Sequence, residues 1–244
     1  MNKTQLNMQI RELQYPLFDK FPQVSCSSIW IPEEQYSPTL PQQQAHEIFY
    51  QILAQRGMPE NKVVMCPQVH GNRIAHFQPS EALPPECDGI FTEETEVPLV
   101  IRTADCAAIM IFSARQQIIA NVHAGWRGVY QNVIENALEA IITTEKIKPS
   151  EIYVAISPFL RSCCYRVTED FLSYFSGDYI TQKENTYFFD LEGAILERLL
   201  NFRIPMENIE MRQECTYCSP LKLPSYRRTK TTNRILSIIQ LTGG

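Results

Sequence analysis

Two apolar runs that lie almost next to each other in the sequence strongly limit the folds open to this chain. Ala107–Phe112 and Gln117–Val122 are rich in Ala, Ile and Val, and only Ser113–Gln116 separates them. Short runs of this kind are typical of buried strands. So short a connection joins antiparallel neighbours, because a parallel crossover needs about a dozen residues or more. The sequence therefore predicts an antiparallel strand pair inside a sheet.

Other apolar runs predict the rest of the fold. Helical periodicity appears in Pro41–Arg56, which Gly57 would end, after Gly128 in Val129–Ile141, and after Asp190 in Leu191–Leu199. We expect an α+β fold in which one domain, residues 1–244, packs helices on a mixed, largely antiparallel sheet. Further strands are expected at residues 25–32, 62–66, 98–102, 151–157 and 234–241.

Composition excludes several classes of protein. With 244 residues and 44% hydrophobic content, the chain can bury a sizeable core. The net charge of −5 and the lack of a long Lys/Arg block argue against a nucleic-acid-binding surface. No apolar run approaches the ~18 residues of a membrane span, and the N-terminus lacks the apolar region of a secretory signal. We therefore expect a soluble, cytoplasmic protein without a membrane partner, whose eight cysteines are mostly reduced thiols.

The predicted strand pair brings two reactive side chains to one end of the sheet. Cys106 directly precedes the first run and His123 directly follows the second, so antiparallel pairing would place them close together. His70 lies in a second strand-to-turn setting, in PQVHGNR. One Cys and two His suit zinc with an open fourth position. Packing roles for an isolated Cys or His are the alternative, and spacing alone does not join His70 to the other two.

Several motifs together resemble the YfiH-like laccase-domain family, also described as the multicopper polyphenol oxidase or purine nucleoside phosphorylase family. They match from about Pro67 to the C-terminus, and TADC together with HAGWRG is the most specific part. The resemblance implies that His70, Cys106 and His123 bind a catalytic zinc. The motifs are QVHG at Gln68–Gly71, CDGIFT at Cys87–Thr92, TADC at Thr103–Cys106, HAGWRG at His123–Gly128 and SYRR at Ser225–Arg228.

The resemblance also implies an activity on purine nucleosides. The expected reaction is phosphorolysis of adenosine, guanosine or methylthioadenosine to a free base and a sugar 1-phosphate, with adenosine deamination beside it. A blue multicopper cluster is excluded, because copper is held largely by imidazoles and the chain has only four histidines. The chain departs from the family pattern at SPFL (Ser157–Leu160) and in YRRTKTTNR after Tyr226, which affects loop geometry and substrate preference more than the metal ligands.

Candidate substrate residues are assigned by chemistry. Phosphate binding needs guanidinium groups, for which we select Arg228 first and Arg102 and Arg127 after it. Asp88 and Asp105 are candidates for acid–base work or for orienting a metal-bound imidazole, with turn or cap roles as the alternative. Trp126 would stack on a base or fill the edge of the core.

A separate C-x-x-C pair, Cys215 and Cys218, has the spacing of a zinc knuckle and would need Cys163 and Cys164 as its second pair. Because adjacent cysteines are awkward ligands for one ion, two packed thiols are the favoured interpretation of Cys215 and Cys218.

Two other kinds of function stay open. Cys106 and His123 would serve as a metal-free nucleophile and base in a hydrolase or amidase that acts on an acyl substrate such as a cell-wall precursor. Alternatively, the chain would be a non-catalytic partner-binding module with a structural metal. The sequence leaves the preferred nucleoside and the oligomeric state open.

Overall fold

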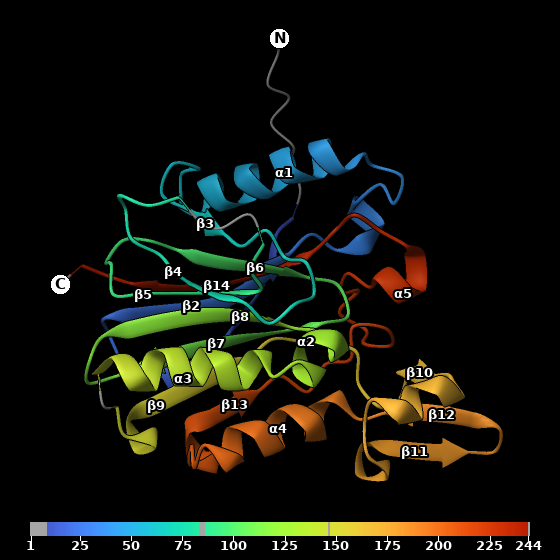
Figure 1. Cartoon of the computed structure of the whole chain (residues 1–244). Coiled ribbons are helices and arrows are strands. Elements are labelled where there is room, and N and C mark those ends of the chain that lie inside the picture. Colours follow the sequence, from blue (N-terminus) through green and yellow to red (C-terminus); the bar gives the residue numbers. More distant parts are fainter. Residues whose placement is uncertain (1–8, 83–85, 146, 244) are drawn as a thin grey trace.

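Two mixed β-sheets packed face to face form the centre of the molecule (Figure 1). The computed structural model describes residues 9–82, 86–145 and 147–243. In the six-stranded sheet the order is β13 (Ile209–Met211), β9 (Ile152–Ile156), β7 (Ala107–Ser113), β8 (Ile118–Ala124), β5 (Gly89–Thr92) and β4 (Ile74–His76). In the five-stranded sheet it is β1 (Arg11–Gln14), β2 (Val24–Trp30), β14 (Ile235–Leu241), β6 (Leu99–Thr103) and β3 (Val64–Met65).

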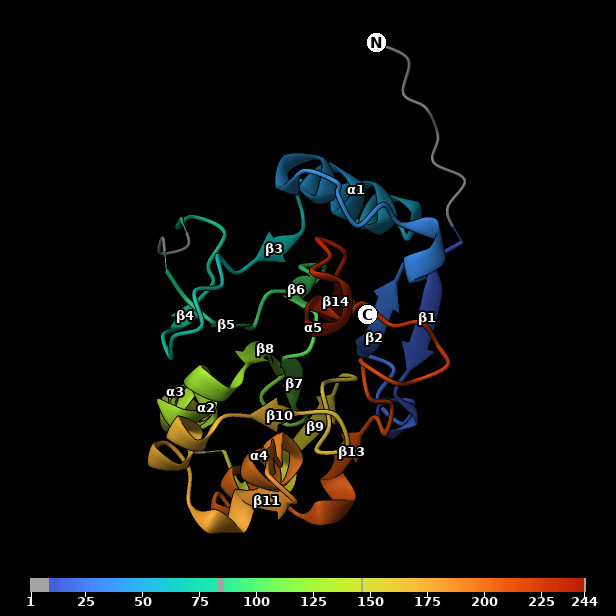
Figure 2. The same ribbon diagram turned by 90° about the vertical axis from the view of Figure 1, so that its right-hand side faces the viewer.

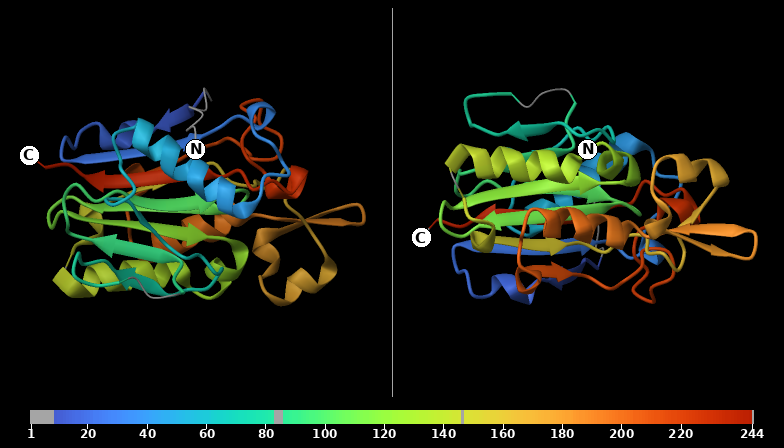
Figure 3. Two further views of the ribbon diagram at one scale, coloured as in Figure 1. Left: turned by 90° about the horizontal axis from the view of Figure 1, so that it is seen from above. Right: turned by 60° about the horizontal axis from the view of Figure 1, so that its bottom comes forward.

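The pairs at three of the sheet edges are parallel, and the inner pairs are antiparallel. Parallel pairing joins β13 to β9, β4 to β5 and β3 to β6. The predicted α+β class, with a mixed and largely antiparallel sheet, is therefore confirmed. A small antiparallel sheet of β10 (Arg166–Val167), β12 (Thr186–Phe189) and β11 (Ile180–Lys183) extends from one end of the molecule (Figure 3).

Helices cover both outer faces of the paired sheets. Helix α1 (Gln42–Gln55) lies on the five-stranded sheet, while α3 (Val133–Glu145) and α4 (Leu191–Asn201) lie on the six-stranded sheet (Figure 1). Two shorter helices, α2 (Trp126–Tyr130) and α5 (Tyr226–Thr229), lie at the end of the sheets seen in Figure 2. Short 3₁₀ turns occupy Pro16–Phe18, Glu33–Gln35, Pro149–Glu151, Glu169–Ser173, Gly177–Tyr179 and Met206–Asn208.

Strand β7 shows why its sequence lacks polar alternation. Successive side chains of a strand point to opposite faces. Ile109 and Ile111 pack toward the helices, whereas Met110 and Phe112 pack between the two sheets, and all seven residues of the strand are buried. A strand covered on both faces is apolar along nearly its whole length, as β7 is up to Ser113 at its end.

The predicted helices form, with one difference. Helix α1 buries its expected face and ends before Gly57, which adopts the left-handed φ of 77°. Asp190 caps α4 by accepting a hydrogen bond from the N–H of Gly193. The helical periodicity of Val129–Ile141 is divided between α2 and α3, because Asn132 takes a φ of 66°, which asparagine tolerates better than most residues. Within the described ranges, no helix is both long and apolar enough to cross a bilayer.

Candidate metal centre and the adjoining cavity

The register of β7 and β8 brings Cys106 and His123 together. The two strands pair antiparallel as predicted, with Ala107 opposite Ala124 and Ala108 opposite His123. Cys106 immediately precedes β7, so its side chain lies beside the last residues of β8. Cys106, at the start of β7, and His123, near the end of β8, therefore lie at the same end of the sheet.

His70 completes a three-residue cluster. The candidate ligand atoms of His70, Cys106 and His123 all lie within 4.8 Å of one another. The two imidazole rings are 4.8 Å apart and nearly perpendicular, at 80°. His123 is buried, Cys106 is half-buried and His70 is exposed, so the cluster opens toward solvent on the His70 side.

The loop that carries His70 is attached to β6 by a side chain. The Gln68 amide donates to the carbonyl of Arg102 at 2.8 Å and accepts from its N–H at 3.0 Å. This pair of bonds imitates strand pairing and holds the loop beside the sheet. His70 itself has a φ of 63°, a backbone conformation that non-glycine residues adopt rarely and that occurs often at functional sites.

The buried carboxylate of Asp88 organises both histidines. Its Oδ1 accepts from His123 Nδ1 at 2.7 Å and from the His70 N–H at 2.9 Å. Its Oδ2 accepts from the N–H groups of Gly71 at 2.7 Å and Val69 at 3.2 Å. Burial acts to raise the pKa of Asp88, but the hydrogen bonds from His123 and Gly71 outweigh it and lower that pKa. The ionised carboxylate thus fixes the His123 ring and leaves its Nε2 for a ligand.

Cys106 and His123 stabilise each other's charged forms. Burial favours the neutral thiol, yet the charge of His123 and hydrogen bonds from His123 and His70 lower the pKa of Cys106 to about 6. Burial also favours neutral imidazole, but the Cys106 thiolate and Asp88 raise the pKa of His123 to about 9. A thiolate available at neutral pH is the form that binds a metal or acts as a nucleophile.

Gly125 leaves the room that Cys106 occupies. A Cβ atom at Gly125 would lie 2.8 Å from Cys106 Sγ, closer than real Cβ contacts. The first glycine of HAGWRG, Gly125, is therefore required because the backbone there lies close to the Cys106 sulfur.

Asp105 joins the cluster to α5. It accepts hydrogen bonds at 2.7 Å from the hydroxyls of Thr216 and Ser225 and from the N–H of Arg227. Ser225 in turn caps α5 by accepting from the N–H of Arg228 at 3.2 Å. Asp105 has a φ of 94°. Because Asp105 directly precedes Cys106, its hydrogen bonds to Ser225 and Arg227 hold the SYRR segment close to the cysteine.

The three selected arginines have different surroundings. All the N–H groups of the Arg228 guanidinium have protein partners: it pairs with Glu33 and donates to the carbonyls of Thr216, Tyr217 and Leu223. Arg102 is half-buried and contacts His46 Nε2 at 2.6 Å and the Cys66 carbonyl at 3.1 Å. Arg127 is exposed, lies 4.6 Å from the Trp126 ring and lines a cavity.

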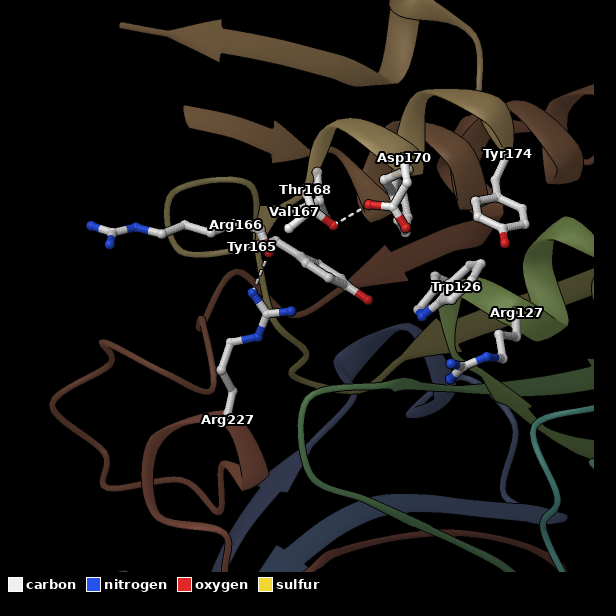
Figure 4. Close-up of a pocket in the computed structure, with 10 residues that line it drawn as sticks. Trp126, Arg127, Tyr165, Arg166, Val167, Thr168, Asp170, Tyr174 and Arg227 are labelled. Atoms are coloured by element: carbon white, nitrogen blue, oxygen red, sulfur yellow. Dashed lines mark hydrogen bonds between the residues drawn. The ribbon is translucent and has the colours of Figure 1, made fainter. Parts of the chain in front are cut away.

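That cavity, of about 440 Å³, is lined on one side by Trp126 and Arg127, which follow His123 in the HAGWRG motif (Figure 4). Arg227 extends over the Tyr165 ring at 4.9 Å on one side, and Trp126 and Arg127 stand on the other. Burial raises the pKa of the Tyr165 hydroxyl, and the charge of Cys106 raises it further, so this wall of the cavity is within electrostatic reach of the cluster. The sequence interpretation missed Arg227, although it lies beside Arg228 in SYRR, as well as Tyr165. The lining residues are Trp126, Arg127, Tyr165, Arg166, Val167, Thr168, Asp170, Phe171, Tyr174 and Arg227.

The two imidazoles and the cysteine sulfur form a candidate metal centre beside a cavity. The protein that carries this centre has an α+β fold of two packed sheets. The chain belongs to the family described as multi-copper polyphenol oxidoreductase laccase, whose model matches residues 42–242. A curated relative from Aquifex aeolicus, named purine nucleoside phosphorylase, is 30% identical over 180 residues, covering 74% of this chain and 83% of the relative. A relative of the same name from Rickettsia conorii is 33% identical over 175 residues, covering 68% of this chain and 71% of the relative.

Solved structures share the fold. The crystal structure of YlmD from Geobacillus stearothermophilus has a TM-score of 0.82 at 24% identity and covers 94% of both chains. That of the Bacillus licheniformis protein YfiH has a TM-score of 0.80 at 21% identity, covering 92% of this chain and 95% of the other. The match to the family model and to the curated relatives confirms the resemblance drawn from the sequence motifs.

Proposed function

We propose that this protein is a zinc-dependent purine nucleoside phosphorylase that also deaminates adenosine. The proposal rests on the position of the His70, Cys106 and His123 cluster beside a cavity with aromatic and guanidinium walls. The names of its curated relatives support the same substrate class.

The donor set fits zinc better than the harder cations. Imidazole and thiolate are ligands that Zn²⁺ prefers, and three protein ligands are the usual number in catalytic zinc sites. The pKa of Cys106 near 6 provides the thiolate at neutral pH, and Asp88 fixes the tautomer of His123. Zinc held there would supply a Lewis acid and a source of hydroxide at neutral pH.

The cavity offers separate walls for the base and for phosphate. Trp126 and Tyr165 present aromatic rings suited to a purine, while Arg127 and Arg227 carry the positive charge that phosphate needs. The cavity volume is within the usual range of small-molecule sites. We therefore assign the phosphate role to Arg127 and Arg227, which line the cavity, ahead of Arg228 and Arg102, which do not. One guanidinium N–H of Arg227 donates to the Arg166 carbonyl, whereas all those of Arg228 have protein partners.

The two reactions differ in the attacking group. In phosphorolysis a phosphate oxygen bonds to C1′ of the sugar, the bond from C1′ to the purine nitrogen breaks, and the base leaves with a proton. Holding phosphate and nucleoside in one cavity lowers the entropic cost of that encounter. In deamination water adds at the purine C6 and ammonia leaves, so adenosine becomes inosine. Deamination requires no anion site.

Product analysis tests the proposal. With adenosine and phosphate, we expect adenine and ribose 1-phosphate beside inosine and ammonia, and without phosphate we expect only inosine and ammonia. Chromatography of the two mixtures measures all four products. Failure to form a free base from any of adenosine, guanosine and methylthioadenosine would overturn the phosphorylase assignment.

A metal-free Cys106–His123 dyad is the second candidate. The observation that favours it is the mutual stabilisation of thiolate and imidazolium by these two residues. Such a hydrolase would form an acyl-enzyme on Cys106 and would not need His70. Mass spectrometry after incubation with an acylating probe distinguishes the two candidates, because a thiol that binds zinc reacts slowly until a chelator is added.

A further inference from the structure

A second cluster of sulfur atoms lies apart from the candidate metal centre and shares no residue with it. The Sγ atoms of Cys163, Cys164, Cys215 and Cys218 all lie within 4.8 Å of one another. Cys163 and Cys218 are exposed and Cys164 is half-buried, so only Cys215 is buried. The expectation that Cys215 and Cys218 are packed thiols is therefore wrong for Cys218, since a thiol that acts as a small hydrophobe is normally buried.

Backbone contacts bring the two cysteine pairs together from distant parts of the chain. Phe159 and Cys215 form an isolated parallel bridge, and the N–H of Thr216 donates to the Phe159 carbonyl at 3.1 Å. The turn after Arg161 is closed by the N–H of Cys164, which donates to the Arg161 carbonyl at 2.9 Å. This turn places the sulfurs of both adjacent cysteines in the cluster. Cys163 and Cys164 can therefore bind the same ion although they are adjacent in the sequence.

The spacing of the sulfurs suits a tetrahedral metal. Zinc–sulfur bonds of ~2.3 Å place the sulfurs of a tetrahedral site roughly 3.8 Å apart. Cys163 Sγ and Cys218 Sγ are 3.8 Å apart. A disulfide needs ~2.05 Å between its sulfurs and would join only two of the four. All eight cysteines lie in the described ranges and are free thiols.

We propose that Cys163, Cys164, Cys215 and Cys218 bind a structural zinc ion. Four sulfur ligands close the coordination shell, so this site has no open position for a substrate. It is a different kind of site from the one at His70.

A metal here would stabilise the junction behind α5. Thr216, between the two cysteines of the C-x-x-C turn, donates to Asp105, and Arg228 donates to the carbonyls of Thr216 and Tyr217. The zinc would therefore fix a turn on which the position of Asp105 and of the SYRR segment depends. Its role is to hold structure, and none of its four cysteine ligands lines the cavity.

Zinc content of variants purified with zinc under reducing conditions tests the proposal. We expect about two zinc ions per wild-type chain and about one in His70→Ala and in a Cys163→Ser/Cys218→Ser double variant, each of which leaves two ligands at one site. Combining His70→Ala with the double variant should leave none. Cys26→Ala, which removes a buried thiol that contacts Met110, is the matched control and should keep both ions.

A second measurement needs no cysteine variant and so covers the case in which those variants fail to fold. Zinc X-ray absorption on His70→Ala should show a metal bound by sulfur alone, at ~2.3 Å. A zinc-free His70→Ala protein, a disulfide within the cluster of the reduced protein, or a double cysteine variant that still binds two zinc ions would overturn the proposal. Failure of the catalytic proposal is distinguishable, since it would remove the zinc that depends on His70 and leave the all-sulfur zinc in place.

Discussion

Replacing Asp88 by asparagine should weaken both the fold and the metal site, because one carboxylate serves four donors. Each Asp88 oxygen accepts two hydrogen bonds, Oδ1 from His70 N–H and His123 Nδ1, and Oδ2 from Val69 and Gly71 N–H. Asparagine keeps one carbonyl oxygen and turns the other acceptor into an NH₂ group. Whichever way the amide faces, two of the four donors lose their acceptor.

The size of the effect follows from that count. Two unpaired donors at ~1–3 kcal/mol each reduce the free energy of unfolding by roughly 2–6 kcal/mol. For a chain of this length, such a loss lowers Tm by roughly 5–20 °C. Loss of the carboxylate behind a metal-binding imidazole typically lowers metal affinity by about 10–100-fold. Calorimetry of chelator-treated Asp88→Asn gives the first quantity, and zinc competition with a chromogenic chelator gives the second.

Glu93→Gln is the matched control. Glu93 pairs with His76 at 2.7 Å, the same distance as in the Asp88–His123 pair, but its side chain is 40% exposed whereas that of Asp88 is fully buried. An exposed pair contributes about 0–1 kcal/mol, so Glu93→Gln should change Tm by only about 3 °C or less and zinc affinity not at all. Equal behaviour of the two variants would refute the role given to Asp88.

Three further predictions concern the same region. Gly125→Ala should reduce zinc affinity about tenfold or more in the same chelator competition, since its Cβ would displace the Cys106 sulfur, and an unchanged affinity would contradict the required close approach. Arg127→Ala should raise the phosphate KM about tenfold or more in steady-state assays without a comparable loss of deamination, whereas Arg228→Ala should chiefly lower Tm; the reverse pattern would restore Arg228 as the phosphate ligand. In chelator-treated protein, the rate of Cys106 alkylation by iodoacetamide should rise with increasing pH, with a midpoint near pH 6. An ordinary cysteine would show a midpoint near pH 9, but the lowered pKa of Cys106 preserves its thiolate down to about pH 6. The stability that this thiolate contributes is accordingly present at high pH and lost as pH falls through about 6, and a midpoint near 9 would disprove the interaction with His123.

The strand pair and two of the three cluster residues, Cys106 and His123, were predictable because their cause is local. Apolar composition and a four-residue connection specify the β7–β8 pair, and antiparallel register then brings Cys106 and His123 to one end. The division of the helix at Asn132 was less visible, because asparagine in a left-handed conformation leaves the apolar periodicity unchanged.

The remaining parts of the site depend on contacts between distant residues. His70 is held in the cluster by the contacts that Gln68 makes with β6 and by its own hydrogen bond to Asp88. Neither contact can be predicted from the spacing of these residues in the sequence. The guanidinium of Arg228 is paired with Glu33, 195 residues earlier in the chain, which leaves it less suited to bind phosphate. The cysteine cluster likewise depends on the bridge between Phe159 and Cys215. Motifs located these residues, whereas only their three-dimensional neighbours determine what each one contacts.

Metal-dependent nucleoside turnover is the most direct test of the proposed centre. Phosphorolysis of adenosine should be measured on wild-type protein of known zinc content, on chelator-treated protein, and on His70→Ala, together with the rate at which iodoacetamide labels Cys106. Chelation and His70→Ala should each abolish turnover and each expose Cys106 to the reagent, because two remaining ligands hold a divalent ion poorly. Normal turnover by metal-free protein, or full activity of His70→Ala, would contradict the zinc mechanism and identify Cys106 as a nucleophile.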